Sequence, residues 1–357
     1  MIKKQTVITG LDIGSSKVSA VASEIDKGGV FTILAQVTQN SKGVSRGAIV
    51  DLDEAVSSAS GVLSKLRDKI GRNPGDIYAN ISGQTITGAR STGMIPLSIR
   101  GREVTKADMD RCANAAGITH VPFDREIIHR VIQRYSIDDR PWVRNPLGLY
   151  ASRLNCEVFI VTADSNHAQN IYKCVNNAGY DVKELVFTGI ADGAALFDKE
   201  DKGSTALLLD MGASLTEICI FCEGAMSDLE IAQVGADEVK AGFKDNARFD
   251  ALLSKIEMKR DLLLKSGGNI SSVILTGAAA FIDDLIEFME ERLSCRVKIG
   301  VAREIKGDIS SIDSMKLTTA IGLAKYAHEK RDRKRRESRN IAHRISNTVV
   351  DIFNNYF

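Results

Sequence analysis

Apolar residues alternate with small and polar ones in two widely separated stretches of the chain. In the first, Val7-Ile8 leads into Asp12 and a turn at 14–17; in the second, a run at 207–209 leads into Asp210 and a turn at 212–215. The alternation resumes after each turn, so each stretch predicts a β-hairpin. Because the turn residues are small, backbone N–H groups can approach an anionic ligand closely. Each hairpin turn is therefore predicted to bind a phosphate group.

The two hairpins together predict a polyphosphate site. If they face each other, they hold the phosphates from both sides, and Asp12 and Asp210 are placed to hold a hydrated Mg²⁺ ion. A single Asp-x-Gly segment is about as often an ordinary tight turn, but its repetition at the distance of one domain favours a ligand site. The residues expected at the phosphates and the metal are Asp12, Gly14, Ser15, Ser16, Lys17, Asp210, Gly212, Ala213, Ser214 and Thr216.

Two common nucleotide-binding patterns are absent from the sequence. A P-loop requires Gly-x-x-x-x-Gly-Lys followed by Ser or Thr at the start of a helix, whereas both turns here lead into strands. The Gly-x-Gly-x-x-Gly fingerprint of dinucleotide-binding folds does not occur either. The sequence therefore argues against Walker-type and Rossmann-type nucleotide binding.

The remaining pattern places each hairpin in its own lobe. In the first lobe, strands at 6–13, 17–24 and 30–39 precede a helix that Asp51 or Asp53 caps and Gly71 closes. A βββα order is not a βαβ unit, and it indicates a mixed sheet with a helix on one face. The second lobe repeats this order, with a hairpin at 205–221, a strand at about 226–234, a helix at roughly 250–266 and a strand at 273–275.

In residues 76–162 the pattern of apolar and polar residues changes, and it predicts a small α+β insert in the first lobe. Strand-like runs at 77–81, 94–99, 127–137 and 156–161 surround a helix that starts at Thr105 with Asp108 three residues on, as in a capping box. The only tryptophan, Trp142, lies in a loop of this insert. A helix ending at Gly179 and a strand at 182–187 return the chain to the first lobe.

Small residues mark two further features. The segments 189–196 and 317–327 predict slim helices that approach each other and join the lobes at a hinge, although core packing alone also explains them. In the second lobe, the strand 273–275 runs into a small-residue turn against which a ligand's base or sugar can lie. The residues assigned to this side of the site are Gly235, Gly277, Ala278, Ala279 and Phe281.

Composition sets the class of protein. With 357 residues, 44% of them hydrophobic and 26% charged, the chain suits a soluble globular protein with two cores. A net charge of +1 gives no global field that would recruit nucleic acid, so no nucleic-acid partner is expected. No apolar stretch reaches the length of a signal peptide or of a membrane-spanning helix, which predicts a cytoplasmic protein.

The C-terminal segment 341–357 predicts an amphipathic helix, because its apolar residues fall on one half of a helical wheel. The run 330–339 before it is rich in Lys and Arg and is expected to act as a tether. Apolar insertion beside basic charge suits reversible attachment to an anionic membrane; the alternative is a helix docked on the protein's own body. The residues expected to enter the membrane are Ile341, Ile345, Val349, Ile352, Phe353, Tyr356 and Phe357.

In this order, the motifs resemble the FtsA family of bacterial cell-division proteins, which share the fold of actin, Hsp70 and sugar kinases. The matching segments are 10–17 and the motif at Asp210 for the phosphates, 77–83 opening the family's inserted subdomain, 145–149 with 161–163, 273–277 for adenosine, and 319–323 for the late connecting helix. The amphipathic tail resembles the family's membrane-targeting element. The resemblance covers almost the whole chain.

The resemblance implies an α/β, two-lobed actin-like ATPase fold with a small α+β insert in the first lobe. The expected boundaries are 1–75 and 163–196 for the first lobe, 76–162 for the insert, 197–327 for the second lobe, 328–340 for a basic linker and 341–357 for the membrane-targeting helix. It also implies a protein that binds ATP and Mg²⁺, is at most a weak ATPase, associates with itself into filaments and tethers the tubulin-like protein FtsZ. The implied place is the cytoplasmic face of the cell membrane at the division site.

The chain departs from the family pattern in three places. Residues 212–215 stand where the family usually has a Gly-Gly-Gly-Thr turn, and Ala278 replaces a common second Gly in the adenosine turn. Both changes weaken the expectation of ordinary nucleotide binding. The short passage from 240 to 250 omits most of the peripheral subdomain that receives the FtsZ C-terminal peptide in the family. A reduced second lobe is therefore expected, with FtsZ binding left to residues 239–256 or to another surface.

Two alternatives share part of this pattern. A sugar or acetate kinase has the phosphate hairpins but also needs a catalytic carboxylate in a substrate cleft, which the segment 76–162 does not offer. A PilM-like pilus-assembly protein shares the insert and ends without a membrane helix. In the FtsA-like case, nucleotide sets the orientation of the lobes and supports head-to-tail assembly, and many weak tails on one filament act through avidity.

Overall fold

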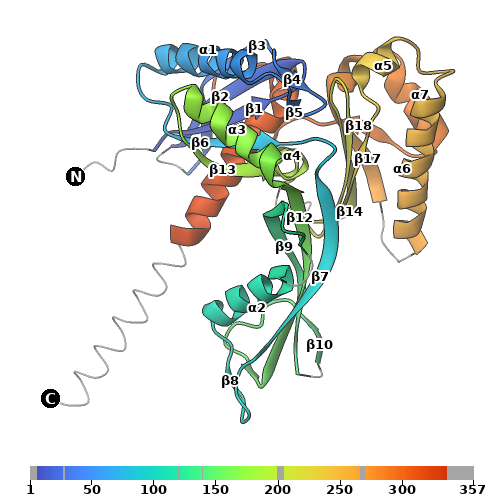
Figure 1. Cartoon of the computed structure of the whole chain (residues 1–357). Coiled ribbons are helices and arrows are strands. Elements are labelled where there is room, and N and C mark those ends of the chain that lie inside the picture. The colour runs from blue at the N-terminus through green and yellow to red at the C-terminus, as the bar shows by residue number, and fades with distance from the viewer. Residues whose placement is uncertain are drawn as a thin grey trace.

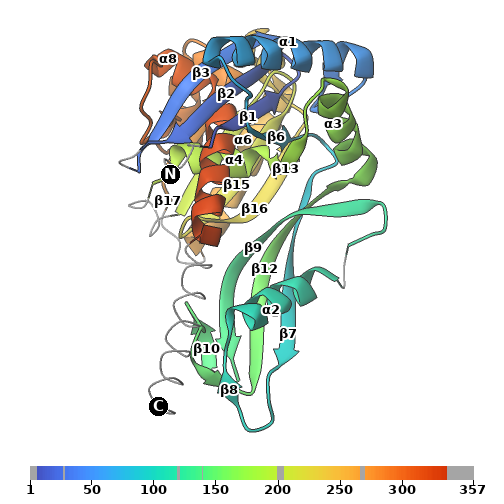
Figure 2. The same ribbon diagram turned by 90° about the vertical axis from the view of Figure 1, so that its left-hand side faces the viewer.

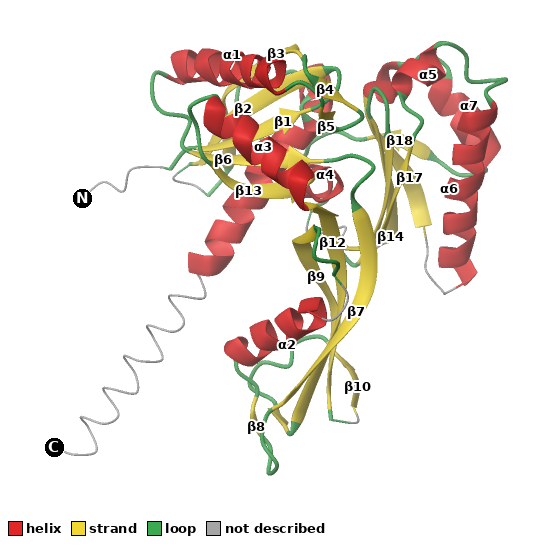
Figure 3. Cartoon of the chain, in the orientation of Figure 1, coloured by secondary structure: helices red, strands yellow, loops and turns green. Residues whose placement is uncertain are grey.

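Two α/β lobes lie side by side, and a narrow insert projects from the first lobe, in the computed structural model of the chain (Figure 1). The structure describes residues 6–26, 29–118, 121–138, 140–198, 205–265 and 270–335. Helices cover the outer faces of both lobes, while the insert is mainly strand (Figure 3). In this described part, no helix is both long and apolar enough to cross a bilayer.

Each lobe is built on a five-stranded mixed sheet, and the two sheets have the same topology. The first contains β1 (Ile8–Ile13), β2 (Lys17–Ile25), β3 (Phe31–Asn40), β6 (Asp76–Ile81) and β13 (Val182–Phe187), in the order β13-β6-β1-β2-β3. The second contains β14 (Thr205–Met211), β15 (Thr216–Cys222), β16 (Ala225–Ala232), β17 (Ile270–Gly277) and β18 (Val297–Ile299), in the order β16-β15-β14-β17-β18. In both, the first strand pairs antiparallel with the second and parallel with the fourth. The predicted hairpins are thus confirmed as β1–β2 and β14–β15.

The helix predicted after the third strand is α1 (Leu52–Ile70). The Asp51 side chain caps it by accepting a hydrogen bond from the backbone N–H of Glu54, and Gly71 closes it in the left-handed conformation. Its buried face includes Val62, Leu63 and Leu66, which belong to the first-lobe core with the β1 and β2 side chains. A short two-stranded ribbon, β4 (Val44–Ser45) and β5 (Ala48–Ile49), precedes the helix.

The two slim helices predicted at a hinge do cross. They are α4 (Thr188–Leu196), which follows α3 (Ser165–Asn177) and β13, and a helix at 318–335 that follows α8 (Ser311–Lys316). A Cβ added to Gly322 would lie 1.9 Å from the Ala191 carbonyl oxygen, and one added to Gly10 would lie 2.0 Å from that of Ala320. Glycine is therefore required at both contacts, because any side chain would push the helices and β1 apart.

The last helix runs further than the sequence pattern indicates. Residues 328–335, assigned to a basic linker, are helical and continue the element that starts at 318. Lys330 Nζ donates to both carboxylate oxygens of Glu184 at 2.6 Å, and the Tyr326 hydroxyl donates to the same carboxylate at 3.0 Å. These bonds to β13 hold the charged segment against the body. The remainder of the linker and the amphipathic tail at 341–357 lie outside the described residues.

The insert forms a separate four-stranded sheet with one helix on it. Its elements are β7 (Thr87–Pro96), β8 (Arg102–Glu103), α2 (Lys106–Ile118), β9 (Arg125–Ile137), β10 (Arg140–Val143), β11 (Tyr150–Ala151) and β12 (Arg153–Asp164). The sheet order is β10-β9-β12-β7, and β8 pairs with β11 apart from it. The strand expected at 94–99 was wrongly placed: β7 lies mostly before it, because pairing with β12 along residues 87–96 fixes the strand.

The second lobe is compact on its outer side. Helices α5 (Ala236–Lys240) and α6 (Ala247–Lys265) follow β16 with only residues 241–246 between them. After β17, a short 3-10 helix η2 (Ala278–Phe281) precedes α7 (Leu285–Leu293). The buried residues Phe249, Leu252 and Leu253 of α6 pack with Leu285 and Met289 of α7 in the second-lobe core. The short passage that the sequence predicts between residues 240 and 250 is present.

Candidate functional site

A cavity of about 1030 Å³ lies between the two hairpin turns. It is bounded by the end of β6, the start of α4, the turn from β17 into η2, and residues 313–319, which run from α8 into the last helix. Each lobe thus contributes one hairpin and the strand next to it. A cavity of this volume suits a ligand of nucleotide size.

Most of the site residues predicted from the sequence line this cavity. They are Asp12, Gly14, Ser15, Ser16, Lys17, Asp210, Gly212, Ala213, Ser214, Gly277, Ala278 and Phe281. The other three lie behind the turns. The Thr216 hydroxyl donates to the Val234 carbonyl oxygen at 2.6 Å, a Cβ on Gly235 would lie 2.3 Å from the Ala213 carbonyl oxygen, and Ala279 is fully buried. Thr216 and Gly235 thus shape the second turn, and Ala279 packs inside the lobe, so none of the three lines the cavity.

The first hairpin turn is held from two sides. The Gly14 N–H donates to the Lys17 carbonyl oxygen at 3.0 Å and closes the turn. The Ser15 hydroxyl accepts a hydrogen bond from the Gly47 N–H at 3.1 Å, and Lys17 Nζ donates to the Lys316 carbonyl oxygen. The turn therefore brings an ammonium group to the cavity while its own backbone stays fixed.

Asp12 stands at the end of β1 and is almost completely buried. Asn80 on the neighbouring β6 donates from Nδ2 to Asp12 Oδ1 at 2.9 Å and accepts at Oδ1 from the Ile13 N–H at 2.7 Å. Burial raises the pKa of Asp12 to about 6, and the nearby charge of Lys17 limits the rise. Asn80 was not among the predicted site residues, although a polar residue inside the apolar run 77–81 was a usable signal.

Asp210 occupies the matching position at the end of β14. Burial and the charge of Asp12 raise the pKa of Asp210 to about 7, and Lys17 opposes the rise. Gly277 on the adjacent strand has φ +85°, and a Cβ there would lie 2.4 Å from Asp210 Oδ1. Glycine is required here, so that the turn after β17 can approach this carboxylate.

Two further acidic residues belong to the same region and were missed from the sequence. Glu217 lines the cavity from β15; its Oε1 accepts from the Ser82 hydroxyl at 2.5 Å, and its Oε2 is buried without a partner. Asp192 on α4 accepts from the Thr319 hydroxyl at 2.8 Å, and its Oδ2 likewise has no partner. Burial and repulsion from Asp210 raise the pKa of both carboxyls well above their usual range. The sequence contained a signal for both site residues: Glu217 is a carboxylate within an apolar strand, and Asp192 is a carboxylate within a helix of small residues.

The donor set fits a hydrated Mg²⁺ ion beside phosphates. Within the described ranges, no three His, Cys, Asp or Glu side chains are close enough to hold a metal by themselves. Mg²⁺ usually keeps several waters and takes substrate phosphate oxygens with only one or two carboxylates. The buried and unpartnered oxygen of Glu217, together with Asp12 and Asp210, offers negative charge that a bound cation would offset.

Comparison with known proteins assigns the insert. Residues 83–162 match the family model of the SHS2 domain inserted in FtsA. Over most of its length the chain is similar to the cell division protein FtsA of Borreliella burgdorferi, at 27% identity with 91% of this chain and 92% of that protein covered. FtsA of Pseudomonas aeruginosa is 26% identical, with 92% and 91% covered. The resemblance to FtsA is thus confirmed.

Solved structures show the fold. The type IV pilus biogenesis complex of PilM and PilN contains a chain with TM-score 0.64 and 12% identity, covering 89% of this chain and 97% of that one. The ethanolamine utilization protein EutJ of Carboxydothermus hydrogenoformans has TM-score 0.50 and 13% identity, covering 91% and 90%. The chain therefore has the two-lobed actin-like fold with an insert in its first lobe, as the sequence predicted.

The alignment also agrees with the reduced second lobe. The match to the Borreliella protein runs over 378 residues, although this chain has only 357. That relative must therefore contain residues with no counterpart here.

Proposed function

We propose that this chain, which is similar to the FtsA cell-division proteins over nearly its whole length, is an actin-like protein of the bacterial division site. It binds ATP with Mg²⁺ between its lobes, associates with itself head to tail, and tethers FtsZ filaments to the cytoplasmic face of the cell membrane through residues 341–357. The observation that carries this proposal is the FtsA-type insert in a two-lobed fold whose two hairpin turns line one cavity.

The cavity supports nucleotide binding. Backbone N–H groups of the two turns and the Lys17 ammonium group are placed for the phosphates, and Asp12, Asp210 and Glu217 supply the charge that orients a hydrated Mg²⁺. The turn at 277–278 and the half-exposed Phe281 ring offer a surface for the base. A nucleotide that contacts both turns would fix the angle between the lobes, because it would bridge one hairpin turn from each lobe.

Calorimetric titration with ATP, with and without Mg²⁺, tests this site. We expect binding in both conditions and tighter binding with Mg²⁺, and we expect Asp12→Asn to remove most of the Mg²⁺ dependence. Absence of heat with ATP at millimolar concentration, while the protein is folded, would contradict nucleotide binding.

Membrane recruitment is tested at the tail. Phe353→Asp places a charge on the apolar half of the predicted helix, where it should abolish binding to anionic vesicles and membrane fractionation in cells. Asn354→Asp is the matched control, because the same charge falls on the polar half. If deletion of 341–357 left membrane binding unchanged, a PilM-like role without a membrane helix would be favoured.

We assign the FtsZ C-terminal peptide to the remaining outer part of the second lobe, around residues 239–256. A groove of about 350 Å³ there runs between the end of β16 and α6, lined by Ile231, Val234, Arg248, Leu252 and Lys255 among others. Lys255→Glu should weaken binding of that peptide in fluorescence anisotropy while vesicle binding stays unchanged. Equal affinity of the variant and the unchanged chain would place the peptide elsewhere.

A further inference from the structure

We propose that the distal end of the insert is a second contact with an anionic membrane surface; this inference rests on the tethering proposed above. The distal end is defined as residues 97–103 and 140–153. It includes the two-stranded β8–β11 sheet and lies at the tip furthest from the two lobes (Figure 2). No part of it contributes to the cavity between the lobes.

Large apolar side chains are exposed at this end. Ile99 is fully exposed, Tyr150 is 71% exposed and Trp142 is 54% exposed. Leu147 and Leu149 are also partly exposed, at 45% and 40%. Trp and Tyr combine an apolar ring with a polar atom and are enriched where membranes meet water. These side chains therefore have the composition of a membrane-interface contact.

Basic residues surround the apolar ones. Arg100, Arg140 and Arg144 are exposed. Of the acidic residues nearby, Glu103 is exposed, whereas the Asp138 carboxylate is engaged by the N–H groups of Ser152 and Arg153 at 2.9 Å each. The excess of positive charge complements anionic lipid headgroups, to which each basic residue near the surface adds attraction.

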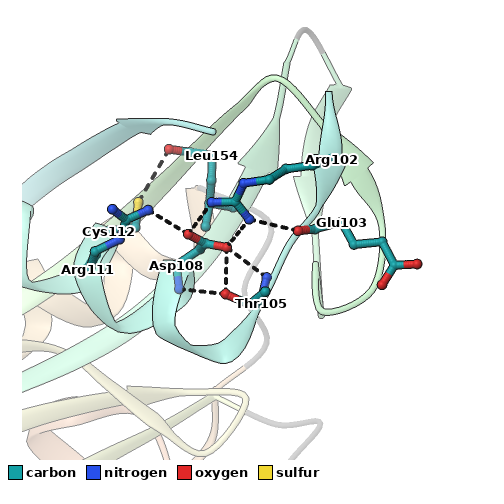
Figure 4. A network of polar contacts seen from close by, with 7 residues as sticks. All are labelled: Arg102, Glu103, Thr105, Asp108, Arg111, Cys112 and Leu154. Carbon is teal, nitrogen blue, oxygen red and sulfur yellow. Dashed lines mark hydrogen bonds and ion pairs between the residues drawn. The ribbon is translucent and has the colours of Figure 1, made fainter. Parts of the chain in front are cut away.

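A buried carboxylate fixes the geometry of this end. Asp108 at the start of α2 accepts from Arg102 at 2.6 and 2.7 Å, from Arg111 at 2.6 Å and from the Thr105 hydroxyl at 2.6 Å (Figure 4). These bonds hold the pKa of Asp108 well below its usual range. They tie β8 to α2, so the turn that carries Ile99 is already ordered before it meets a surface. Pre-ordering lowers the entropy cost of binding.

Trp142 is likewise held in place. The Arg134 guanidinium lies 3.3 Å from the centroid of its ring, and Arg134 pairs with Glu157 at 2.5 Å. The arginine covers one face of the indole, while more than half of the side chain remains exposed. The exposed part is available to a membrane without any rearrangement of the strand.

The orientation of the last helix favours a membrane as the occupant. In both Figure 1 and Figure 2, the helix at 318–335 leaves the first lobe on the side toward which the insert projects. Its final turn carries Arg331, Arg333 and Arg335. A membrane held by the segment that follows would therefore face the distal end of the insert. Two weak contacts on one molecule reinforce each other through effective concentration.

The single tryptophan makes this contact directly observable. Trp142 is the only tryptophan in the chain, so emission excited selectively from tryptophan reports on the distal end alone. Full-length protein is mixed with vesicles of phosphatidylglycerol and phosphatidylethanolamine, and vesicle binding is measured in parallel by sedimentation. We expect a blue shift of the emission and quenching by brominated lipids, and neither effect with vesicles of phosphatidylcholine alone.

Substitutions at the distal end test its contribution. The double variant Ile99→Asp with Tyr150→Asp should weaken vesicle binding at least tenfold and abolish the blue shift, and Arg100→Glu should weaken it about fivefold or more. Phe123→Asp is the matched control, because Phe123 is fully exposed but precedes β9 at the opposite end of the insert, beside α3. That variant should behave like the unchanged chain.

The outcomes separate this inference from the tethering. If vesicles sediment the protein without changing Trp142 emission, the second contact is wrong and the tethering stands. If Phe353→Asp still sediments and still shows the blue shift, the distal end binds on its own and the tail is not the anchor. A shift that depends on protein concentration without vesicles would make this surface a contact between copies of the chain and overturn the inference. Absence of any vesicle binding would refute both proposals.

Discussion

The two lobes have the same strand order but meet the cavity with different chemistry. In the first lobe, Asp12 receives a hydrogen bond from Asn80 on the neighbouring strand, and the turn after it carries Lys17. In the second, Asp210 pairs with Thr276, the following Gly277 lies against the Asp210 carboxylate, and the hairpin turn carries no charged side chain. The first lobe therefore supplies side-chain charge and hydrogen bonds, and the second supplies close approach of backbone.

The supports of the two turns differ in the same way. The first turn is held by a side chain as well as by backbone, since the Ser15 hydroxyl accepts from the Gly47 N–H and the Ser41 N–H donates to the Ser16 carbonyl oxygen. The second is held by backbone, since the N–H groups at the start of α5 donate to the carbonyl oxygens of Gly212 and Ala213 at 2.8 and 3.0 Å. A repeated topology thus gives two halves of one site that are not interchangeable, and matched substitutions should show this.

The largest expected effect is a difference in stability between substitutions at two glycines, Gly277 in the turn after β17 and Gly14 in the first hairpin turn. Gly277→Ala forces a side chain into a positive-φ position and against Asp210 Oδ1, so the free energy of unfolding should fall by about 2–4 kcal/mol. Gly14→Ala should cost about 1 kcal/mol or less, because its φ is not positive and its nearest non-adjacent neighbour, the Lys17 carbonyl oxygen, is 3.1 Å away. Urea unfolding measures both. Equal losses would mean that the turn after β17 is packed no more tightly than the first hairpin turn.

The next largest effect is expected on ATP binding, from loss of the positive charge that Lys17 brings to the cavity. Lys17→Met should weaken ATP binding by about 30-fold, close to 2 kcal/mol, because the ammonium group is the cation beside both hairpin carboxylates. Lys65→Met is the control, since that lysine lines the same cavity from α1. Titration calorimetry compares them. A loss as large for Lys65→Met would show that only overall positive charge matters.

The two hairpin carboxylates should also differ in pH dependence. Their folded-state pKa values, about 6 for Asp12 and about 7 for Asp210, are raised from 3.8, so their stabilisation is full below about pH 3.8 and is lost as pH rises through 6 and 7. Asp210→Asn removes the titration near pH 7 and Asp12→Asn the one near pH 6, and Asp12→Asn also lowers the pKa of Asp210, which the Asp12 charge raises. Each variant of the nucleotide-free protein should therefore lose less stability between pH 5 and pH 8 than the unchanged chain. Urea unfolding at the two pH values tests this, and an undiminished loss in either variant would contradict it.

The smallest effect lies in the side-chain support of the first turn. Ser15→Ala removes the acceptor for the Gly47 N–H and should cost about 1 kcal/mol. Ala213→Ser is the comparison in the second turn, where backbone bonds remain and stability should stay within about 0.5 kcal/mol. Thermal unfolding at one pH gives both values. A larger loss from Ala213→Ser would show that the second turn depends on its side chain after all.

Local sequence patterns were enough to predict the elements whose hydrogen bonds and caps involve residues close together in the chain. The hairpins follow from alternation with a period of two, and α1 from its Asp51 cap and Gly71 terminator, because these signals act within a few residues. The start of α2 follows from the same kind of signal, since Thr105 and Asp108 bond to each other. The course of β7 was misplaced because residues 87–93 are small, polar and mostly exposed, so pairing with β12 had to define the strand.

The sequence alone determined that there would be two hairpins with a carboxylate each, an insert between them and slim helices at the hinge, because spacing and small residues encode these directly. Only the tertiary structure decided that Asn80 reaches Asp12, that Glu217 and Asp192 join the acidic cluster, and that Glu184 holds the helix through 335. Each of these contacts joins residues far apart in the chain. Which of many polar side chains meet depends on how strands and helices pack, and that packing is set by the whole core.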